Sequence, residues 1–285
     1  MRVVEPANFK RRRIKLHAKV TAVWLIFALL IGLGGYSLWQ LSQPSSSPKR
    51  RNDKPTVKAE STTVPTPKPP KTFTGEQFKQ LYHSITYPNT QPLVGTNEIT
   101  GNSLADQRIR QLAQQAGYRP TSYPINPILK IPGMESPDNQ LQPQALSAWL
   151  DLKAMAEQEL IPIKIISAFR TIDYQRQLFL SRLLSPTVTP ETIAAGQSDQ
   201  AVEVTLHLTA VPGYSRHHTG YTVDFGCDDG SSTFAKSICF SWLNANNYLN
   251  AKERGWIPSY PPGANEQGPE PEPWEYVWVG RDKLV

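Results

Sequence analysis

The stretch Ser215-Arg216-His217-His218-Thr219-Gly220-Tyr221-Thr222-Val223-Asp224 places an imidazole, a glycine and a carboxylate within ten residues. A catalytic zinc ion takes three protein ligands and one water, and imidazole nitrogen and carboxylate oxygen are both suitable ligands. Gly220 permits a sharp turn, and the alternation over residues 221–225 predicts a short strand whose even positions share one face. We therefore expect His217 and Asp224 to be two ligands of a metal site, although the pattern alone also fits an ordinary turn entering a strand.

The charge of the chain is unevenly distributed, and this bears on its partners. Its 285 residues carry a net charge of +6, with 39% hydrophobic residues, a composition typical of globular proteins. Residues 1–20 hold seven Lys/Arg and one Glu, and residues 41–72 hold seven Lys/Arg and two acids, so these stretches carry +11. The 16 basic and 21 acidic residues elsewhere give −5, so the folded region lacks the basic character of a nucleic-acid-binding domain.

A membrane anchor is predicted near the amino end. Residues 20–39 read VTAVWLIFALLIGLGGYSLW, twenty residues without a charge, which matches the hydrocarbon thickness of a bilayer. The basic residues before this run predict a cytoplasmic tail over residues 1–19, because positively charged flanks stay inside. A cleaved signal peptide is the alternative, but the apolar run is long and Gly-Gly-Tyr-Ser-Leu-Trp is a poor cleavage site. We predict an uncleaved single-pass anchor over residues 20–40 in the cell membrane, with the rest of the chain outside, facing the periplasm or cell wall.

A linker and one folded domain follow the anchor. Residues 41–72 contain seven prolines with Ser, Thr and Lys, a composition that favours extended chain and cannot bury a core. Residues 73–285 show helical and strand periodicities. Helices are predicted over residues 73–83, 103–116, 143–159, 173–184, 198–208 and 233–247, and strands over residues 161–167, 221–225 and 276–279. Helices around a few short antiparallel strands make an α+β domain.

Cys227 and Cys239 are the only two cysteines, and both lie in the exported half. A disulfide is compatible with that compartment, and so are two free thiols.

Three motifs occur in an order that matches a known family. They are Ser167-Ala168-Phe169-Arg170 with Gln175, the pattern S-x-H-x-x-G-x-x-x-D from Ser215 to Asp224, and Glu272-Pro273-Trp274 before the last strand. Together they resemble the VanY-type zinc D-alanyl-D-alanine carboxypeptidases, of the LAS group of metallopeptidases, from about residue 105 to residue 280. Ala168 stands where the family usually has glycine, which affects loop shape more than chemistry.

The resemblance implies an α+β metallopeptidase, with helices packed around a small antiparallel sheet, that acts on the peptide stems of peptidoglycan. It assigns His217 and Asp224 as zinc ligands and Glu272 as the general base. It assigns substrate contacts to Arg170, for the terminal carboxylate, and to Gln175 and Ser215 nearby. These residue types suit the roles, because a guanidinium binds a carboxylate through two parallel hydrogen bonds and a carboxylate beside zinc-bound water accepts its proton.

One position departs from the family. The family's last motif ends in histidine, the third zinc ligand, and this chain has Glu275 there. Glu275 would complete a His, Asp and Glu set, whose harder oxygen ligands also admit manganese or iron. Alternatively His218 or His207 takes the third position, or the domain binds wall peptides without cleaving them.

We therefore expect a membrane-anchored, metal-dependent carboxypeptidase that removes a terminal D-amino acid, D-alanine, from peptidoglycan stem peptides. Two other functions remain open at this stage. One is an inactive module that binds stem peptides through a degenerate metal site. The other is an endopeptidase that cuts within the stem.

Overall fold

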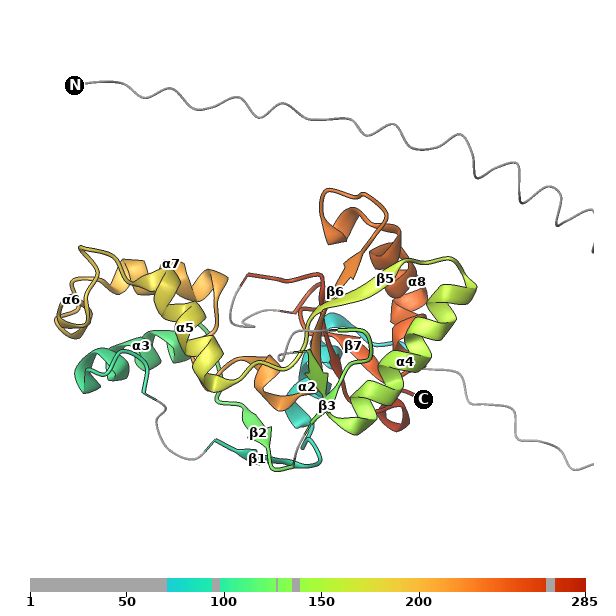
Figure 1. Cartoon of the computed structure of the whole chain (residues 1–285), viewed down its shortest axis with the longest axis horizontal. Coiled ribbons are helices and arrows are strands. Elements are labelled where there is room, and N and C mark those ends of the chain that lie inside the picture. Colours follow the sequence, from blue (N-terminus) through green and yellow to red (C-terminus); the bar gives the residue numbers. More distant parts are fainter. Residues whose placement is uncertain (1–70, 94–97, 127, 135–138, 265–269) are drawn as a thin grey trace, which may run out of the picture. The chain divides into compact units, whose positions relative to one another are not determined.

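The computed structural model describes residues 71–93, 98–126, 128–134, 139–264 and 270–285 (Figure 1). Within these ranges no helix combines the length and the hydrophobicity needed to span a bilayer. The predicted cytoplasmic tail, the predicted anchor and the linker up to residue 70 lie outside the described residues. They remain predictions from the sequence.

A four-stranded antiparallel sheet is the centre of the domain. Its strands are β5 (Ile163–Ser167), β6 (Thr222–Cys227), β8 (Glu275–Trp278) and β7 (Trp256–Pro258), paired in that order. Two smaller antiparallel sheets pair β1 (Thr90–Pro92) with β2 (Ser122–Pro124) and β3 (Leu129–Lys130) with β4 (Gln140–Leu141). The α+β prediction is confirmed, while β7 and the two small sheets were not predicted.

One face of the edge strand β5 is buried and the other is exposed: Ile163 and Ile165 are buried, whereas Lys164 and Ile166 on the opposite face are exposed. Successive side chains of a strand point to opposite faces, so the buried set packs against α4 (Pro143–Gln158) and α8 (Ile238–Lys252). The core on this side also includes α2 (Gly75–Ser84) through Phe78.

A second core lies among helices on the other side of the domain. Helices α3 (Ser103–Gln115), α5 (Ile172–Leu183), α6 (Pro190–Ala194) and α7 (Asp199–Leu208) bury a separate set of aliphatic residues. These four helices gather together, apart from the sheet with α4 and α8, in Figure 1. Strand β5 runs directly into the turn before α5, so the residues between them, 168–171, connect the two cores.

Helix α8 is broken near its middle, where the sequence predicted an uninterrupted helix up to residue 247. Asn246, Asn247 and Tyr248 have positive φ angles of 51°, 57° and 61°. Asparagine tolerates this left-handed conformation better than most residues. The side chain of Asn247 also accepts a hydrogen bond from the Phe73 backbone nitrogen at 2.9 Å and donates one to its carbonyl at 2.8 Å. The break therefore fastens the start of the domain to the helix.

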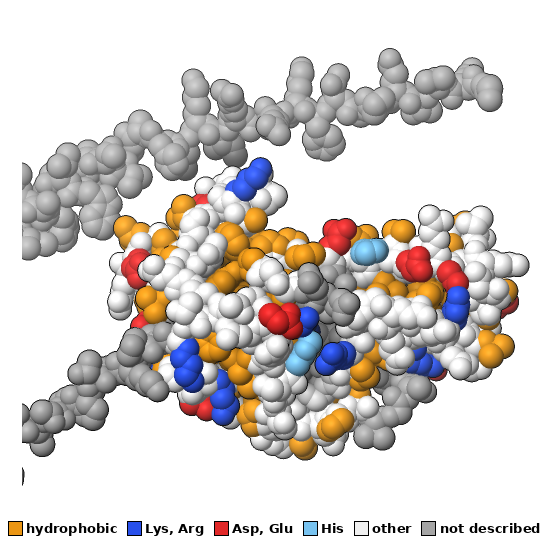
Figure 2. Space-filling model, turned by 180° about the vertical axis from the view of Figure 1, so that it is seen from behind, with side chains coloured by type: hydrophobic (Ala, Val, Ile, Leu, Met, Phe, Trp, Pro, Cys, Tyr) orange, Lys and Arg blue, Asp and Glu red, His pale blue; other side chains and the backbone are white. Residues whose placement is uncertain are grey.

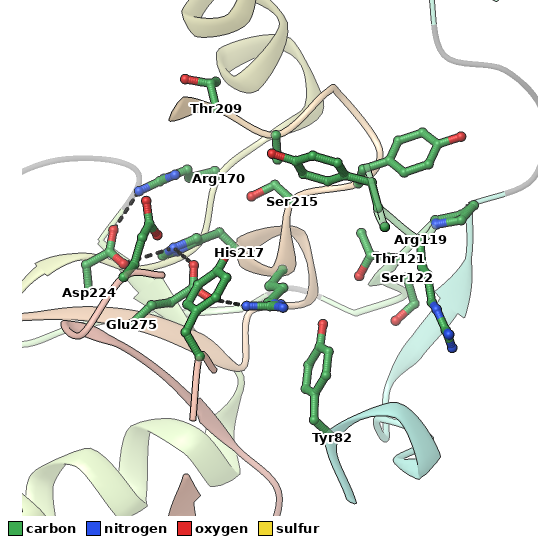
Figure 3. Close-up of a pocket in the computed structure, with 18 of the residues that line it drawn as sticks. Tyr82, Arg119, Thr121, Ser122, Arg170, Thr209, Ser215, His217, Asp224 and Glu275 are labelled. Carbon is green, nitrogen blue, oxygen red and sulfur yellow. Dashed lines mark hydrogen bonds and ion pairs between the residues drawn. The ribbon is translucent and has the colours of Figure 1, made fainter. Parts of the chain in front are cut away.

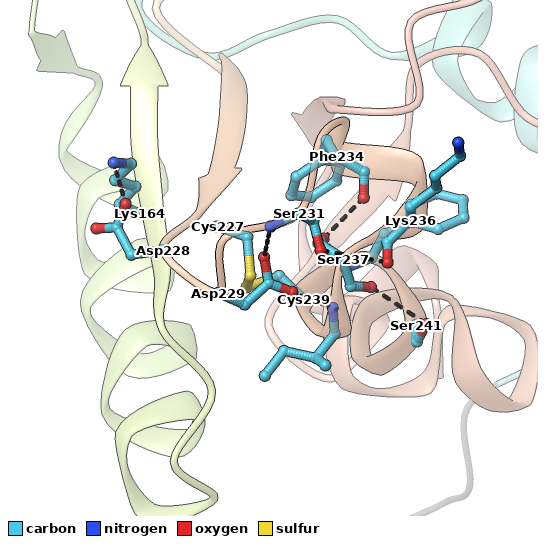
Figure 4. The surroundings of a disulfide bond; sticks show 12 residues. Lys164, Cys227, Asp228, Asp229, Ser231, Phe234, Lys236, Ser237, Cys239 and Ser241 are labelled. Atoms are coloured by element: carbon cyan, nitrogen blue, oxygen red, sulfur yellow. Dashed lines mark hydrogen bonds and ion pairs between the residues drawn. A yellow bond between two sulfur atoms is a disulfide. The ribbon is translucent and has the colours of Figure 1, made fainter.

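The sequence alone allowed either a disulfide or two free thiols, and the structure contains the disulfide. Cys227 at the end of β6 is bonded to Cys239 in the first turn of α8, with 5.8 Å between their Cα atoms. The bond closes the loop that connects the sheet to that helix (Figure 4).

Candidate metal centre

His217 lies in a short 3₁₀ helix, η1 (Arg216–Thr219), immediately before β6. Gly220 ends this helix with a φ of +74°, a left-handed conformation that L side chains rarely adopt. The buried imidazole has its Nδ1 atom 2.5 Å from the carbonyl oxygen of Ala168. A carbonyl can only accept, so Nδ1 carries the proton and Nε2 is left to act as an acceptor or a metal ligand.

Asp224 and Glu275 face that Nε2 atom from two adjacent strands. They are direct partners in the antiparallel register of β6 and β8, so their side chains stand on the same face of the sheet. Asp224 Oδ1 and Glu275 Oε2 each lie 3.3 Å from His217 Nε2. Both carboxylates are buried, with 7% and 4% of their residue surfaces exposed.

Each carboxylate has its second oxygen held by an arginine. Arg170 lies 2.6 Å from Asp224 Oδ2, and Arg216 lies 3.1 Å from Glu275 Oε1 (Figure 3). The Arg216 guanidinium also stacks over the rings of Tyr260, at 4.2 Å, and Tyr82, at 4.9 Å. These contacts fix the orientation of the carboxylates and leave one oxygen of each turned toward His217, an outer-shell arrangement that tunes metal ligands.

The geometry and chemistry of the three groups fit a divalent cation. Ligand atoms of His217, Asp224 and Glu275 all lie within 4.8 Å of one another. His217 Nε2 and Asp224 Oδ1 are buried without a hydrogen-bond partner among the described residues, which is costly unless something else satisfies them. Zinc ligands at about 2.1 Å in a tetrahedron are about 3.4 Å apart, close to the 3.3 Å separations observed here. The set fits a mononuclear metal site.

The two carboxylates favour a positive charge at His217, either a proton or a metal ion. Burial and the charge of Arg170 lower the pKa of His217, but the carboxylates of Asp224 and Glu275 outweigh both and raise it to about 9. Burial raises the pKa of Glu275, but its 3.3 Å contact with His217 Nε2 and the charge of Arg216 outweigh burial and lower it to about 2. A proton on His217 and a metal ion would therefore compete for the same position.

Glu272 lies beside this cluster on the turn that leads into β8. The Glu275 backbone nitrogen donates to the Glu272 carbonyl at 3.1 Å, which closes the turn. Burial, followed by the charges of Glu275 and Asp224, raises the pKa of Glu272 to about 8. A carboxylate with a raised pKa next to a metal site can accept a proton near neutral pH.

The cluster forms one wall of a cavity of about 420 Å³. Arg170, Ser215 and Glu272 line it together with the three candidate ligands, so six of the seven predicted residues meet there. Tyr82, Arg119, Thr121 and Ser122 lie across the cavity from the cluster in Figure 3. From the side opposite to Figure 1, acidic, basic and histidine side chains appear together near the middle of the face (Figure 2).

Gln175 is the predicted residue that the structure does not bring to the cavity. It lies in α5 with 1% of its surface exposed, and its amide nitrogen donates to the Ala210 carbonyl at 2.7 Å. It is not among the residues that line the cavity. In this conformation Gln175 supports the segment that leads to the motif.

The two alternative histidine ligands lie elsewhere. His218 uses both ring nitrogens on backbone groups: Nδ1 donates to the Arg170 carbonyl at 2.7 Å, and Nε2 accepts from the Gly213 nitrogen at 3.0 Å. His207 is exposed on α7 and does not belong to the ligand group found in the described part of the chain. Glu275 is therefore the residue that the fold places at the third position.

Arg216 is the site residue that sequence reasoning missed. It occupies the variable position of the S-x-H motif, so the motif itself did not single it out. The signal that could have found it is the change from histidine to Glu275, because a buried carboxylate needs a compensating positive charge. Arg216 is the nearest cation in the sequence to the predicted ligand His217.

A histidine and two carboxylates that can hold one metal ion, with a further carboxylate, Glu272, beside them, are the arrangement expected of a metallohydrolase. The protein family that the chain matches specifies which kind of metallohydrolase it is. The chain belongs to the VanY family, described as D-alanyl-D-alanine carboxypeptidases, whose profile matches residues 138–281, half of the chain and all seven predicted residues. It is accordingly a metallopeptidase of that family. No curated protein matches the chain.

Several solved structures are similar to the chain. A mutant of the vancomycin resistance D,D-pentapeptidase VanY from the VanB-type resistance cassette, in complex with Zn(II), is 25% identical over 57% of this chain and 85% of that chain, with a TM-score of 0.42. VanYB in complex with D-alanine-D-alanine is 25% identical over 58% and 84%, with a TM-score of 0.43. The LD-carboxypeptidase LdcB is 19% identical over 59% and 72%, with a TM-score of 0.42.

Proposed function

We propose that the chain is a zinc-dependent carboxypeptidase that removes a terminal D-amino acid, D-alanine, from peptidoglycan stem peptides. The observation that carries the proposal is the convergence of His217, Asp224 and Glu275 on one point at the wall of a cavity that also contains Glu272 and Arg170. Bound zinc would polarise the scissile carbonyl and acidify a water molecule. Family membership supplies the substrate class.

Arg170 is proposed to bind the free carboxylate at the end of the substrate. Its Nε donates to Ser167 Oγ at 3.0 Å and one terminal nitrogen contacts Asp224, which positions the guanidinium at the rim of the cavity. A guanidinium has five N–H donors, so others remain for a ligand carboxylate. Ser215, buried in the same wall, offers a hydroxyl that could contact the same terminal residue.

Glu272 is proposed to act as the general base. It would take a proton from the attacking water and pass it to the leaving amine, which needs a carboxylate that is ionised before attack and basic enough to accept. The raised pKa of Glu272 supports this role. The bound cation would lower that pKa below about 8, because a positive charge nearby favours the ionised form.

Zinc is the metal proposed, with His217 Nε2, Asp224 and Glu275 as its three ligands. A set of one imidazole and two carboxylates neutralises a divalent ion and should acidify its water less than a set with two imidazoles. The same oxygen-rich set would admit manganese or iron, which metal competition can separate from zinc.

The location is proposed from the sequence: residues 20–40 anchor the chain in the cell membrane and the domain faces the cell wall. Peptidoglycan stems lie on that side. The folded region carries a net negative charge, so we propose no nucleic-acid partner.

The test is D-alanine release from a stem pentapeptide and a stem tetrapeptide by the purified full-length chain loaded with zinc. Release from either supports the proposal. If neither is cleaved and less than about a tenth of an equivalent of metal stays bound after dialysis against chelator-treated buffer, the chain is the alternative: a stem-peptide-binding module with a degenerate metal site. Equal cleavage of stem peptides with and without a free terminal carboxylate would favour the endopeptidase.

A further inference from the structure

Arg216 and Glu275 form a buried ion pair beside the candidate metal centre. The Arg216 Nη1 atom donates to Glu275 Oε1 at 3.1 Å, and the two side chains are 11% and 5% exposed. The other oxygen, Glu275 Oε2, lies 3.3 Å from His217 Nε2. The two oxygens of this carboxylate therefore have different neighbours, a buried guanidinium on one side and the candidate metal position on the other.

Two tyrosine rings hold the guanidinium in this position. The Arg216 Cζ atom lies 4.2 Å from the ring centre of Tyr260 and 4.9 Å from that of Tyr82. Aromatic rings attract a guanidinium through their negative faces. The Ser259 backbone nitrogen donates to the Glu275 carbonyl at 3.0 Å, which places Tyr260 next to β8. Tyr82 points from α2 into the cavity in Figure 3. Two separate parts of the fold therefore fix the cation that holds Glu275.

Asp224 is restrained in a similar way by Arg170. The Arg170 Nη2 atom donates to Asp224 Oδ2 at 2.6 Å, and Asp224 Oδ1 lies 3.3 Å from His217 Nε2. The two arginines differ in exposure, because the Arg170 side chain is 21% exposed and the Arg216 side chain 11%. Arg170 is also the residue proposed to bind the substrate carboxylate. Arg216 is therefore the restraint that does not have to serve the substrate as well.

The restraint on a carboxylate decides how many ligand atoms it supplies. A free carboxylate can bind a metal through one oxygen or through both. A carboxylate with one oxygen held by a buried arginine offers only the other. Zinc favours a small tetrahedral set of ligands, whereas Mn²⁺ favours octahedral sites rich in oxygen. The donor types of His217, Asp224 and Glu275 suit either ion, so the number of available oxygens should decide between them.

We propose that Arg216 is a positioning residue that restricts Glu275 to one metal-bound oxygen and thereby makes the site select zinc over manganese. The inference rests on the metal site of the proposed function and adds the basis of its metal selection. It also gives a physical reason why a glutamate can stand where the family has histidine. With one oxygen held, Glu275 offers a single ligand atom, as an imidazole does.

The first test measures the ratio of the manganese to the zinc dissociation constant of the full-length chain by competition. Both ions carry the same charge, so the loss of the Arg216 charge alters both affinities alike and cancels in the ratio. We expect Arg216→Gln to lower the ratio about tenfold, the size of effect that outer-shell changes have. Arg216→Lys keeps a charged donor and should recover at least half of that loss on a logarithmic scale.

The matched control is Arg108→Gln. This change breaks the ion pair between Arg108 on α3 and Asp199 on α7, and neither residue lines the cavity. The ratio should stay within about two-fold of wild type, because distant sites without shared partners act independently.

X-ray absorption of the zinc-loaded wild type counts the ligands and needs no variant that folds. We expect a shell of about four or five nitrogen and oxygen atoms at about 2.0–2.2 Å. An octahedral shell would overturn the inference. An unchanged ratio in Arg216→Gln would overturn it too, and so would equal losses in Arg216→Gln and Arg216→Lys, which would trace the effect to ring packing and not to the held oxygen.

The same measurements separate this inference from the proposed activity. If the wild type prefers zinc, Arg216→Gln lowers the ratio and no stem peptide is cleaved, the role of Arg216 stands and the proposed activity fails. If stem peptides are cleaved and the ratio does not change in Arg216→Gln, the activity stands and the role of Arg216 is rejected. A wild type that binds neither ion would overturn the inference.

Discussion

Asp224 and Glu275 are direct partners across β6 and β8, and both carboxylates are buried on the same face of the sheet. Like charges at directly opposed positions destabilise a sheet. The pairing is tolerated here because Arg170 and Arg216 each hold one oxygen and because the remaining oxygens meet at His217 Nε2. A divalent cation at that point would satisfy all three groups at once, and the following predictions depend on it.

Glu275→Gln should weaken zinc binding by more than about 100-fold, since losing a ligand should cost more than losing an outer-shell contact. The amide keeps the shape of the side chain but removes a charge that the cation needs. Competition with a chromophoric chelator gives the affinity. Glu270→Gln, which changes an exposed glutamate in the segment before β8, should leave the affinity within two-fold; similar losses in both variants would argue against ligation by Glu275.

Glu275→His should restore the ligand set usual for the family, yet lower the free energy of unfolding of the zinc protein by about 3 kcal/mol. The reason is Arg216, which lies buried against Glu275 and would lose this buried ion pair. Adding Arg216→Gln should recover more than half of that loss. Denaturant unfolding of both single variants and the double variant gives the coupling, and strict additivity would show that Arg216 does not compensate Glu275.

The acidic limb of the pH profile should report Glu272. A general base must be ionised, so kcat/KM should rise with pH through the pKa of Glu272, with a midpoint between its ordinary 4.5 and the value of about 8 that burial and the neighbouring carboxylates produce. Glu272→Gln should lower kcat about 10³-fold while zinc content stays at one equivalent. Loss of zinc from this variant would instead make Glu272 a ligand.

Zinc binding at pH 7 should release at least one proton, because metal ligation requires the imidazole to be deprotonated. Without a cation the neighbouring carboxylates keep the pKa of His217 at about 9, so this proton must leave when the ion arrives. Affinity should therefore fall about tenfold for each pH unit below 9. Calorimetry in buffers with different ionisation enthalpies counts the protons, and a count of zero would contradict the raised pKa of His217 in the metal-free protein.

Arg170→Ala should raise the KM for a stem peptide with a free terminal carboxylate about 30-fold, the equivalent of a charged hydrogen-bonded contact. A peptide with an amidated carboxyl end should be a poor substrate for wild type and should not become poorer in the variant. Arg170→Lys should be intermediate, since it keeps the charge without the planar fork. Equal cleavage of free and amidated peptides by the wild type would point to an endopeptidase.

The local features of the fold could be predicted from the sequence, because they depend on local patterns. Gly220 marked the turn before β6, and the strand predicted over residues 161–167 and the helix predicted over residues 103–116 correspond to β5 and α3. The break in α8 could not be predicted in this way. It depends on the bonds between Asn247 and Phe73, which lie 174 residues apart in the chain.

The candidate ligands could be predicted as residues but their surroundings could not. His217, Asp224 and Glu275 came from motif order, whereas the pairing of Asp224 with Glu275 depends on the register of two strands that are distant in the sequence. Arg216 gains its role only when η1 packs against β8 and the two tyrosines. The burial of Gln175 could not be predicted either. It depends on the hydrogen bond from its side chain to the Ala210 carbonyl, which forms only when α5 packs against the segment that follows α7.

The most direct test of the central claim is the anomalous difference map of a zinc-loaded crystal measured at the zinc absorption edge. The account predicts one strong peak within about 2.0–2.2 Å of His217 Nε2 and of one oxygen each from Asp224 and Glu275. A peak that excludes Glu275, or no peak at this cluster in a crystal soaked with excess zinc, would contradict it.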